Sequence, residues 1–248
     1  MRKKVASLMI VLLSLMSALS LGDEFWDEKP YQEWKAKQCE KLLQDSPWSH
    51  PYAISTVNIP GVMKQGGGTT PDRSFGDGNL VDVAQDREVR LFLQIRFVTA
   101  KPIKAAIGRS RMLAEPENKA LAEQVGQYID QPDGPEVIVE VTYYSEPEGH
   151  LSLRQIENFL RTATLPTLKE RVFLSDSAKG VQVNIGRYQG PYEGYNGALL
   201  LFPRYDEEGN SYFDGSEREI LFHMEMDFAD VDLKLKPRDM VFGGVFTL

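Results

Sequence analysis

Residues 137–143 read VIVEVTY, and this stretch indicates how the chain folds. Its apolar positions are Val137, Val139, Val141 and Tyr143, and the polar positions between them include Glu140 and Thr142. Side chains alternate between the two faces of a strand, so one face of this segment packs on a core and the other lies near water. Such alternation is typical of antiparallel sheet, because the strands of parallel sheets are buried on both faces and read as continuous apolar runs.

The same alternation recurs on both sides of this stretch and predicts further strands. Their apolar positions are Val89, Leu91, Leu93, Ile95 and Phe97; Val181, Val183 and Ile185; Phe222, Met224, Met226 and Phe228; and Val231, Leu233 and Leu235. The run from Ala198 to Phe202 is continuously apolar and predicts one fully buried strand.

The last two of these strands are expected to form a hairpin that reverses at Ala229-Asp230. In that register Glu225 faces Lys234 and Met226 faces Leu233, so that charges and apolar side chains are matched. The loop around Asp206 is expected to join the strand ending at Phe202 to the strand starting near Glu219 as another hairpin.

Two helices are predicted between the strands. Pro116 opens the first, with an apolar side formed by Leu121, Val125, Tyr128 and Ile129. Ser152 and Gln155 form a capping box at the start of the second, which has the apolar stripe Leu153, Ile156, Phe159 and Ala163 and ends at Pro166. A third, shorter helix is expected after Pro102. The fold class is therefore α+β, a mainly antiparallel sheet with two or three helices packed on one face.

The first 22 residues have the pattern of a secretory signal. Arg2, Lys3 and Lys4 precede the charge-free stretch 5–21, and Ser20 and Gly22 occupy the small-residue positions before a cut at Asp23. The alternative is an uncleaved membrane anchor, for which 17 charge-free residues are few, since a spanning helix needs about 20. We expect a periplasmic or extracellular protein with no membrane span after signal removal.

Residues 23–50 are predicted to be a lead-in segment, with a helix from Tyr31 to Gln44 that follows Pro30. Trp34 and Trp48 suggest that this segment docks on the domain, and a partner-binding helix is the alternative. Residues 51–248 form a single domain. It contains a flexible Gly-rich loop at 64–80, which lacks the lysine and hydroxyl that a phosphate-binding loop requires after its last glycine.

Charge and cysteine content narrow the function further. The formal net charge is −8 and becomes more negative when the cationic signal is removed. A protein this acidic is repelled by phosphate backbones and anionic lipid, so nucleic-acid binding is disfavoured. Cys39 is the only cysteine and cannot close an internal disulfide, so it is either buried and inert or free to cross-link.

Signals for catalysis and for metal binding are weak. The chain has no Gly-x-Ser-x-Gly elbow, and its three histidines are His50, His150 and His223. His223, Glu225 and Asp227 share a strand face that could converge on a metal, but a solvated face is the simpler interpretation. The acidic turn 206–210 lacks the spacing of a calcium loop, with Glu217 only near the position of the last ligand. The sequence therefore predicts no catalytic residues, no metal and no cofactor.

The most distinctive segment is the loop at 187–196, which reads RYQGPYEGYN. Tyrosine offers a large contact area and a polar tip at low entropic cost, so recognition surfaces use it often. The predicted binding residues are Arg187, Tyr188, Tyr192, Tyr195 and Asn196. The alternative is a wide turn whose tyrosines fold down over the edge of the core.

Several short motifs carry a resemblance to a group of proteins. These are Pro30-Tyr31 with Trp34, Leu42-Leu43 with Ser46-Pro47-Trp48, Leu200 to Arg204, and Lys236 to Phe242. With them the chain resembles exported bacterial proteins of unknown function that have a Trp-rich lead-in ending in Ser-Pro-Trp and a closing C-terminal hairpin. The resemblance covers the two ends of the chain and implies an envelope or extracellular location, but no activity, cofactor or catalytic residue.

The sequence favours an exported, non-enzymatic domain that binds a protein or glycan of the cell envelope. The alternative is an envelope-directed hydrolase that uses paired carboxylates, since Asp and Glu are plentiful. A third interpretation, a lipid carrier, requires a large apolar cavity under the sheet. The ligand, the biological process and the oligomeric state do not follow from the sequence.

Overall fold

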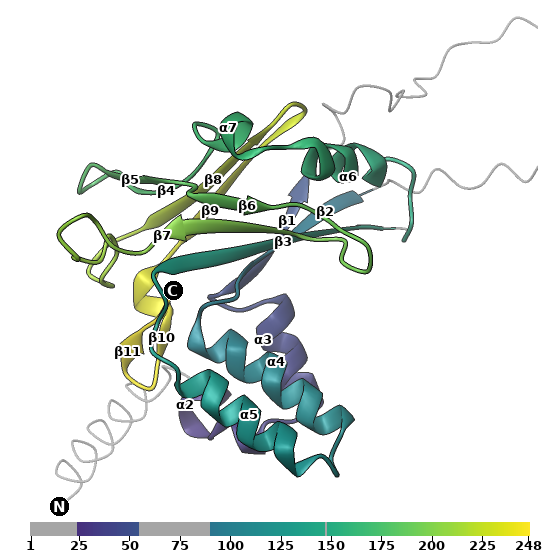
Figure 1. The fold of residues 1–248 in the computed structure, drawn as a ribbon, viewed down its shortest axis with the longest axis vertical. Coiled ribbons are helices and arrows are strands. Elements are labelled where there is room, and N and C mark those ends of the chain that lie inside the picture. Colours follow the sequence, from purple (N-terminus) through teal and green to yellow (C-terminus); the bar gives the residue numbers. More distant parts are fainter. Residues whose placement is uncertain (1–23, 55–89, 147) are drawn as a thin grey trace, which may run out of the picture.

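The computed structural model describes residues 24–54, 90–146 and 148–248, which form the coloured ribbon in Figure 1. The predicted signal segment at 1–22 and the Gly-rich loop at 64–80 lie outside these residues. Among the described residues, no helix has both the length and the apolar character needed to cross a membrane.

The predicted α+β class is confirmed, and the strands form two antiparallel sheets with a small extra hairpin. The first sheet contains, in spatial order, β1 (Ser49–Ile54), β2 (Arg90–Phe97), β3 (Glu136–Glu146), β7 (Ala198–Pro203) and β6 (Arg187–Gln189). The second contains β5 (Val181–Asn184), β4 (Val172–Asp176), β8 (Ile220–Met226) and β9 (Ala229–Leu235). The extra hairpin consists of β10 (Val241–Phe242) and β11 (Val245–Phe246).

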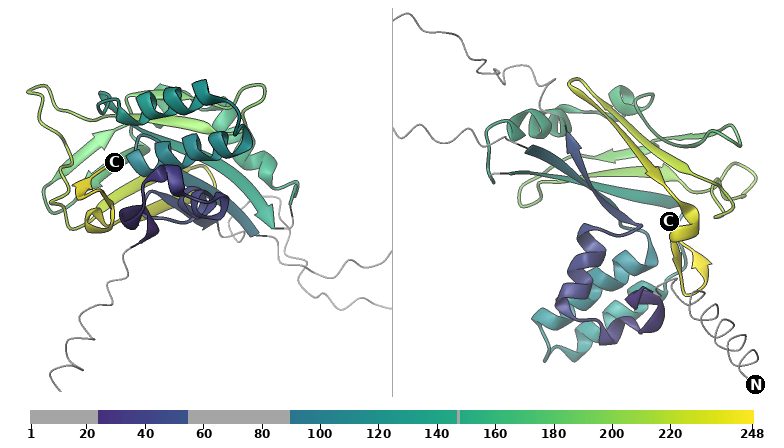
Figure 2. Two further views of the ribbon diagram at one scale, coloured as in Figure 1. Left: turned by 90° about the horizontal axis from the view of Figure 1, so that it is seen from below. Right: turned by 180° about the vertical axis from the view of Figure 1, so that it is seen from behind.

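The two sheets are joined along both sides. On one side the chain passes directly from β5 into β6, where Ile185 N–H donates to Val172 in one sheet and Gly186 N–H donates to Leu201 in the other. On the other side the Tyr52 hydroxyl of β1 donates to the Asp230 carbonyl of β9 at 3.3 Å. The sheets therefore face each other around one core (Figures 1 and 2).

The core contains the apolar positions of the alternating strands. Val137, Val139 and Val141 are buried, as is Leu93 of the neighbouring strand. Aromatic rings join the two sheets, for Phe202 of β7 lies edge-on to Phe222 of β8 with centroids 6.4 Å apart. For these residues the face predicted from the alternation is the face observed. Val89 lies outside the described residues, and Phe228 lies in the turn after β8 instead of in the strand.

Helices α3 (Ala36–Gln44), α4 (Lys101–Ala114) and α5 (Lys119–Asp130) gather on one side of the five-stranded sheet, away from the four-stranded sheet (Figures 1 and 2). The short elements α2 (Phe25–Glu28) and η1 (Tyr31–Glu33) precede them. Helix α6 (Leu153–Thr162) and the single turn α7 (Leu165–Leu168) lie on the opposite side of the five-stranded sheet from these helices, and η3 (Pro237–Asp239) follows β9.

Several helix predictions require correction. Pro116 does not open the helix that follows it, because α5 begins at Lys119 and Asn118 caps it by accepting from the Leu121 N–H. The helix expected to be short, α4, is the longest described. Its small buried residues allow close packing on α5, where a Cβ on Gly108 would lie 2.4 Å from Val125 Cγ1. The expected helix from Tyr31 to Gln44 is divided into η1 and α3. Ser152 makes no side-chain cap on α6, so the predicted capping box is not formed.

The lead-in segment packs against the last residues of the chain. Trp34 and Trp48 are buried, as docking requires. The Trp48 indole donates to the Thr247 carbonyl at 2.9 Å, and the Trp34 ring lies edge-on to Phe242 at 6.2 Å. The two ends of the chain that carry the sequence resemblance thus lie together.

The expected registers at the C-terminal end are wrong. In the β8–β9 hairpin Met226 pairs with Ala229 and Glu225 with Asp230, because the turn occurs two residues earlier, at Asp227-Phe228. Lys234 consequently pairs with Glu219 at 3.2 Å rather than with Glu225. Strands β7 and β8 belong to different sheets, so the segment around Asp206 crosses between sheets and does not close a hairpin.

Candidate functional site

The predicted binding loop begins with β6 at the edge of the five-stranded sheet and turns back into β7 (Figure 1). The turn is held by two backbone hydrogen bonds, from Tyr192 N–H to Tyr195 and from Tyr195 N–H to Tyr192, of 3.1 and 2.9 Å. Gly194 has a φ of +83°, a conformation that a residue with a Cβ adopts only with strain. The loop is therefore a defined turn.

Two of the predicted tyrosines form an aromatic pair. The Tyr192 ring lies 5.3 Å from the Tyr195 ring, at an interplanar angle of 31°, and Tyr192 is 56% exposed. Tyr195 is half-buried and packs closely over Gly197, where a Cβ would come within 2.8 Å of the Tyr195 hydroxyl and of Thr142 Cγ2. An exposed ring thus rests on a second ring that is packed against β3.

A chain of polar contacts connects this pair to the centre of the sheet. The Tyr195 hydroxyl donates to Glu140 Oε1 at 2.8 Å, and the other oxygen of Glu140 accepts from Arg96 Nη1 at 2.5 Å. Arg96 also donates from Nε and Nη2 to the Leu43 carbonyl near the end of α3, at 3.0 and 2.7 Å. Burial, and secondarily the Glu140 carboxylate, raises the pKa of Tyr195, so this phenol stays protonated at neutral pH.

The remaining predicted residues have structural partners. The Tyr188 hydroxyl donates to the Leu160 carbonyl of α6, and burial raises the pKa of Tyr188 to about 12. Arg187 forms a bidentate ion pair with Glu136 of β3, so it is occupied within the chain. Asn196 is exposed beside Tyr195. Of the five predicted residues, Tyr192, Tyr195 and Asn196 lie together at the tip of the loop.

A cavity of about 530 Å³ opens on the same sheet, between the strands and the end of α3. It is lined by Gln44, Asp45, Pro51, Gln94, Arg96, Thr142 and Tyr144. Tyr144 is 37% exposed and stacks on Phe92, with centroids 4.9 Å apart and planes within 11°. Gln94 is buried and donates to the Gln44 carbonyl and to Ser49 Oγ, at 2.8 Å each.

Sequence reasoning missed this cavity. Its strand residues include Gln94, Arg96 and Thr142, polar positions of the alternation, which predicts that they lie on the face near water. The available signal was Tyr144, an aromatic residue on the polar side of β3. Its position on that side follows from the same period of two.

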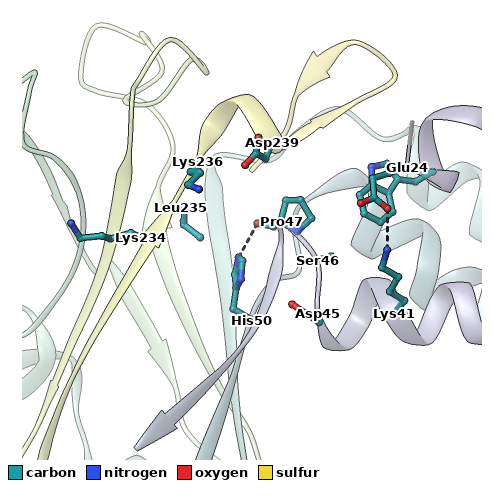
Figure 3. A pocket seen from close by; sticks show the side chains of 11 residues that line it. Glu24, Lys41, Asp45, Ser46, Pro47, His50, Lys234, Leu235, Lys236 and Asp239 are labelled. Atoms are coloured by element: carbon teal, nitrogen blue, oxygen red, sulfur yellow. Dashed lines mark hydrogen bonds and ion pairs between the residues drawn. The ribbon is translucent and has the colours of Figure 1, made fainter. Parts of the chain in front are cut away.

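A second cavity, of about 400 Å³, lies where the lead-in segment meets β9 and η3 (Figure 3). In Figure 3 the His50 ring points to the Pro47 carbonyl, 3.0 Å from Nε2, and burial lowers the pKa of His50. Lys41 pairs with Glu24 at 3.0 Å, and Lys234, Lys236 and Asp239 lie on the opposite wall. Charged side chains of both signs line this cavity, so its lining favours no single class of ligand.

The other residues considered from the sequence are engaged elsewhere. His223 Nδ1 lies 2.7 Å from Asp232, and its ring stacks on Phe173 at 4.6 Å. Glu225 and Asp227 both lie within ion-pair distance of Arg171. Among the described residues, no group of three or more His, Cys, Asp or Glu side chains is placed to hold a metal ion.

The acidic turn is an ordinary hydrogen-bonded turn. Asp206 accepts from the backbone N–H groups of Glu208 and Asn210, at 3.1 and 2.7 Å. Glu217 is buried, pairs with Lys179 at 2.8 Å and accepts from the Gly215 N–H, which fixes the loop before β8. The carboxylates of Asp206 and Glu217 therefore stabilise the loops in which they lie.

Comparison with known proteins names no family. No protein-family model matches the chain, and no curated protein matches it. Among solved structures, the chain is similar to a crystal structure described as a novel protein of unknown function from Burkholderia pseudomallei K96243. The two are 14% identical, the match covers 58% of this chain and 74% of the other, and the TM-score is 0.35.

Proposed function

We propose that this chain is an exported, non-enzymatic binding domain that recognises a glycan of the cell envelope. The recognition face is the outer face of the five-stranded sheet, from the tip of the 190–197 loop to the cavity beside α3. The observation that carries the proposal is the Tyr192–Tyr195 pair, in which a ring that is 56% exposed is supported by a second ring bound to the sheet.

The exposed Tyr192 ring differs from an ordinary exposed side chain because the residues around it hold it in place. Binding costs free energy for every side chain that must be ordered, and a ring already held in place has little freedom to lose. The turn hydrogen bonds and the Tyr195–Glu140 contact restrict the loop before any ligand arrives. A planar exposed ring fits the apolar face of a sugar, and neighbouring polar groups can bind its hydroxyls.

Export is supported by the N-terminal sequence and by the resemblance of both chain ends to exported bacterial proteins. The cationic start, the charge-free run 5–21 and the small residues before Asp23 make up the three parts of a secretory signal. An acidic domain released by this signal would remain free of anionic lipid surfaces. After export, such a domain would be surrounded by the material of the cell envelope.

Retention on isolated envelope material tests the proposal. We expect Tyr192→Ala to abolish retention on protease-treated envelope glycan without changing the melting temperature. Tyr205→Ala is the matched control, because Tyr205 is also exposed, at 40%, but lies in the loop between β7 and β8.

Three results would contradict the proposal. If the Tyr192→Ala variant is still retained, or if the Tyr205→Ala variant loses retention to the same extent, the binding site does not include the Tyr192–Tyr195 pair. Retention that is lost when the envelope is protease-treated indicates a protein partner. Release of soluble sugar fragments by the purified domain indicates the alternative function, an envelope-directed hydrolase that uses paired carboxylates.

A further inference from the structure

We propose that the cavity of about 530 Å³ beside α3 is a saccharide subsite that selects uncharged or amine-bearing sugars and rejects acidic ones. This inference rests on the proposed function, because it assigns the ligand class for the same face. It adds residues that the tyrosine loop does not include, chiefly Asp45, Thr142 and Tyr144.

The cavity and the loop lie along one track on β3. Glu140, Thr142 and Tyr144 share the outer face of this strand, so neighbouring members are about 7 Å apart along it. Tyr195 bonds to Glu140 and packs beside Thr142 over Gly197, while Tyr144 and Thr142 line the cavity. A chain of sugar rings following β3 would therefore pass from one tyrosine to the other.

The lining combines a ring platform with polar groups. Tyr144 is backed by the stacked Phe92 ring, which fixes its plane. Thr142 offers a hydroxyl that donates and accepts, and Gln94 is held in place by its two amide hydrogen bonds at the wall. Few but well-placed polar groups beside an aromatic surface are typical of small-ligand sites.

Charge decides which sugars fit. Arg96 lines the cavity, but its guanidinium already donates to Glu140 and twice to the Leu43 carbonyl. Arg187 is likewise paired with Glu136, so the positive charge of each arginine is already offset by a carboxylate of the chain. The exposed side chain of Asp45 adds negative charge at the C-terminal end of α3, where the helix dipole is also negative. An acidic sugar would meet repulsion there, whereas an amine would be attracted.

Titration with three soluble probes tests this assignment in the full exported domain. The probes are an N-acetylglucosamine oligomer, the same oligomer without its acetyl groups, and a galacturonic acid oligomer of equal length. We expect the first two to bind, the amine-bearing one more tightly, and the acidic one to bind at least roughly tenfold more weakly than the neutral one, about 1.4 kcal/mol. Lower ionic strength should widen the difference between the amine-bearing and acidic probes.

Variants separate the subsite from the loop. Tyr144→Ala and Thr142→Val should each weaken binding of the neutral oligomer. Asp45→Asn should weaken binding of the amine-bearing oligomer and of no other probe. Tyr205→Ala is the control. If Tyr192→Ala abolishes envelope retention but none of the probes binds, the subsite assignment fails while the proposed function stands. Tightest binding of the acidic probe, or saccharide binding unchanged in Tyr144→Ala and Thr142→Val, also overturns the assignment.

Discussion

The hydroxyl of Tyr195 donates a hydrogen bond of 2.8 Å to Glu140, a residue 55 positions earlier in the chain. This contact joins the tip of the loop to the middle strand of the five-stranded sheet. Because Glu140 also binds Arg96, and Arg96 binds the backbone near the end of α3, one carboxylate couples the loop to the helical layer. The position of the exposed Tyr192 ring therefore depends on residues far from it in sequence.

Replacing Glu140 should be visible in the titration of Tyr195. Burial raises the pKa of Tyr195 first and the Glu140 charge raises it further, so Glu140→Gln should lower that pKa while leaving it above the usual value. Ultraviolet titration, with Tyr195→Phe used to assign the signal, measures the change. Tyr188, whose pKa burial alone raises to about 12, should not move. A parallel shift of both phenols would indicate general loosening of the fold.

His50 should make the protein sensitive to mild acid. Burial lowers the pKa of His50 from its usual 6.5, so below pH 6.5 the unfolded chain binds a proton that the folded chain does not. The free energy of unfolding therefore falls as the pH drops from 6.5 toward the folded pKa, and the stability is fully present above 6.5. Melting curves between neutral pH and pH 5 should show a smaller loss for His50→Gln than for the unmodified chain. Equal losses would show that His50 titrates normally.

Cys39 should be inert while the protein is folded. It is fully buried on α3, and burial raises the pKa of its thiol, so little reactive thiolate is present at neutral pH. A thiol reagent should label the protein in denaturant and not before, and Cys39→Ser should shift the melting temperature by only a few degrees. Rapid labelling of the folded chain would contradict the burial of this side chain.

The two faces of the sheets should differ sharply in their tolerance of truncation. Leu93 is fully buried in β2, so Leu93→Ala should cost roughly 2–5 kcal/mol of unfolding free energy by leaving a cavity. Lys234 is exposed and pairs with Glu219, so Lys234→Ala should cost less than about 1 kcal/mol. Chemical denaturation measures both. A double-mutant cycle should find coupling of Lys234 with Glu219 and none with Glu225.

Mass spectrometry of the protein from a producing cell should find an N-terminus near Asp23. The cationic start, the apolar run and the small residues at Ser20 and Gly22 favour cleavage there by a signal peptidase. Changing Gly22 to a bulky residue should slow processing and leave the chain with the membrane fraction. A retained Met1 in otherwise normal protein would instead indicate an anchor.

The sequence predicted the class of the fold because period-two alternation is a local property. Each buried strand face, such as that of Val137, Val139 and Val141, follows from the spacing of apolar residues along one segment. The sequence also predicted that the segment with Trp34 and Trp48 would dock on the domain, and it singled out the 187–196 loop for its tyrosines. Tyr192 and Tyr195 are in contact, because the turn between them is closed by their two backbone hydrogen bonds.

The pairing of residues across neighbouring strands could not be predicted from this alternation. Alternation tells which side chains share a face but not which residue lies opposite, since a shift of the turn by two residues keeps every face and changes every pair. The error at Glu225 and Lys234 is of this kind. The division of the strands into two sheets, with β5 passing into β6 at Gly186, likewise depends on partners distant in sequence.

The sequence by itself determined the antiparallel α+β class, the buried faces and the aromatic turn, because each depends on the order of residues within one segment. Only the tertiary structure decided that Arg187 and Tyr188 have partners within the chain, and that Gln94, Thr142 and Tyr144 line a cavity beside Asp45. These cavity residues come from β2, β3 and the end of α3, which are distant from one another in sequence. A pocket of this kind is set by long-range packing and by which polar groups already satisfy one another, and neither is encoded in the spacing of any single segment.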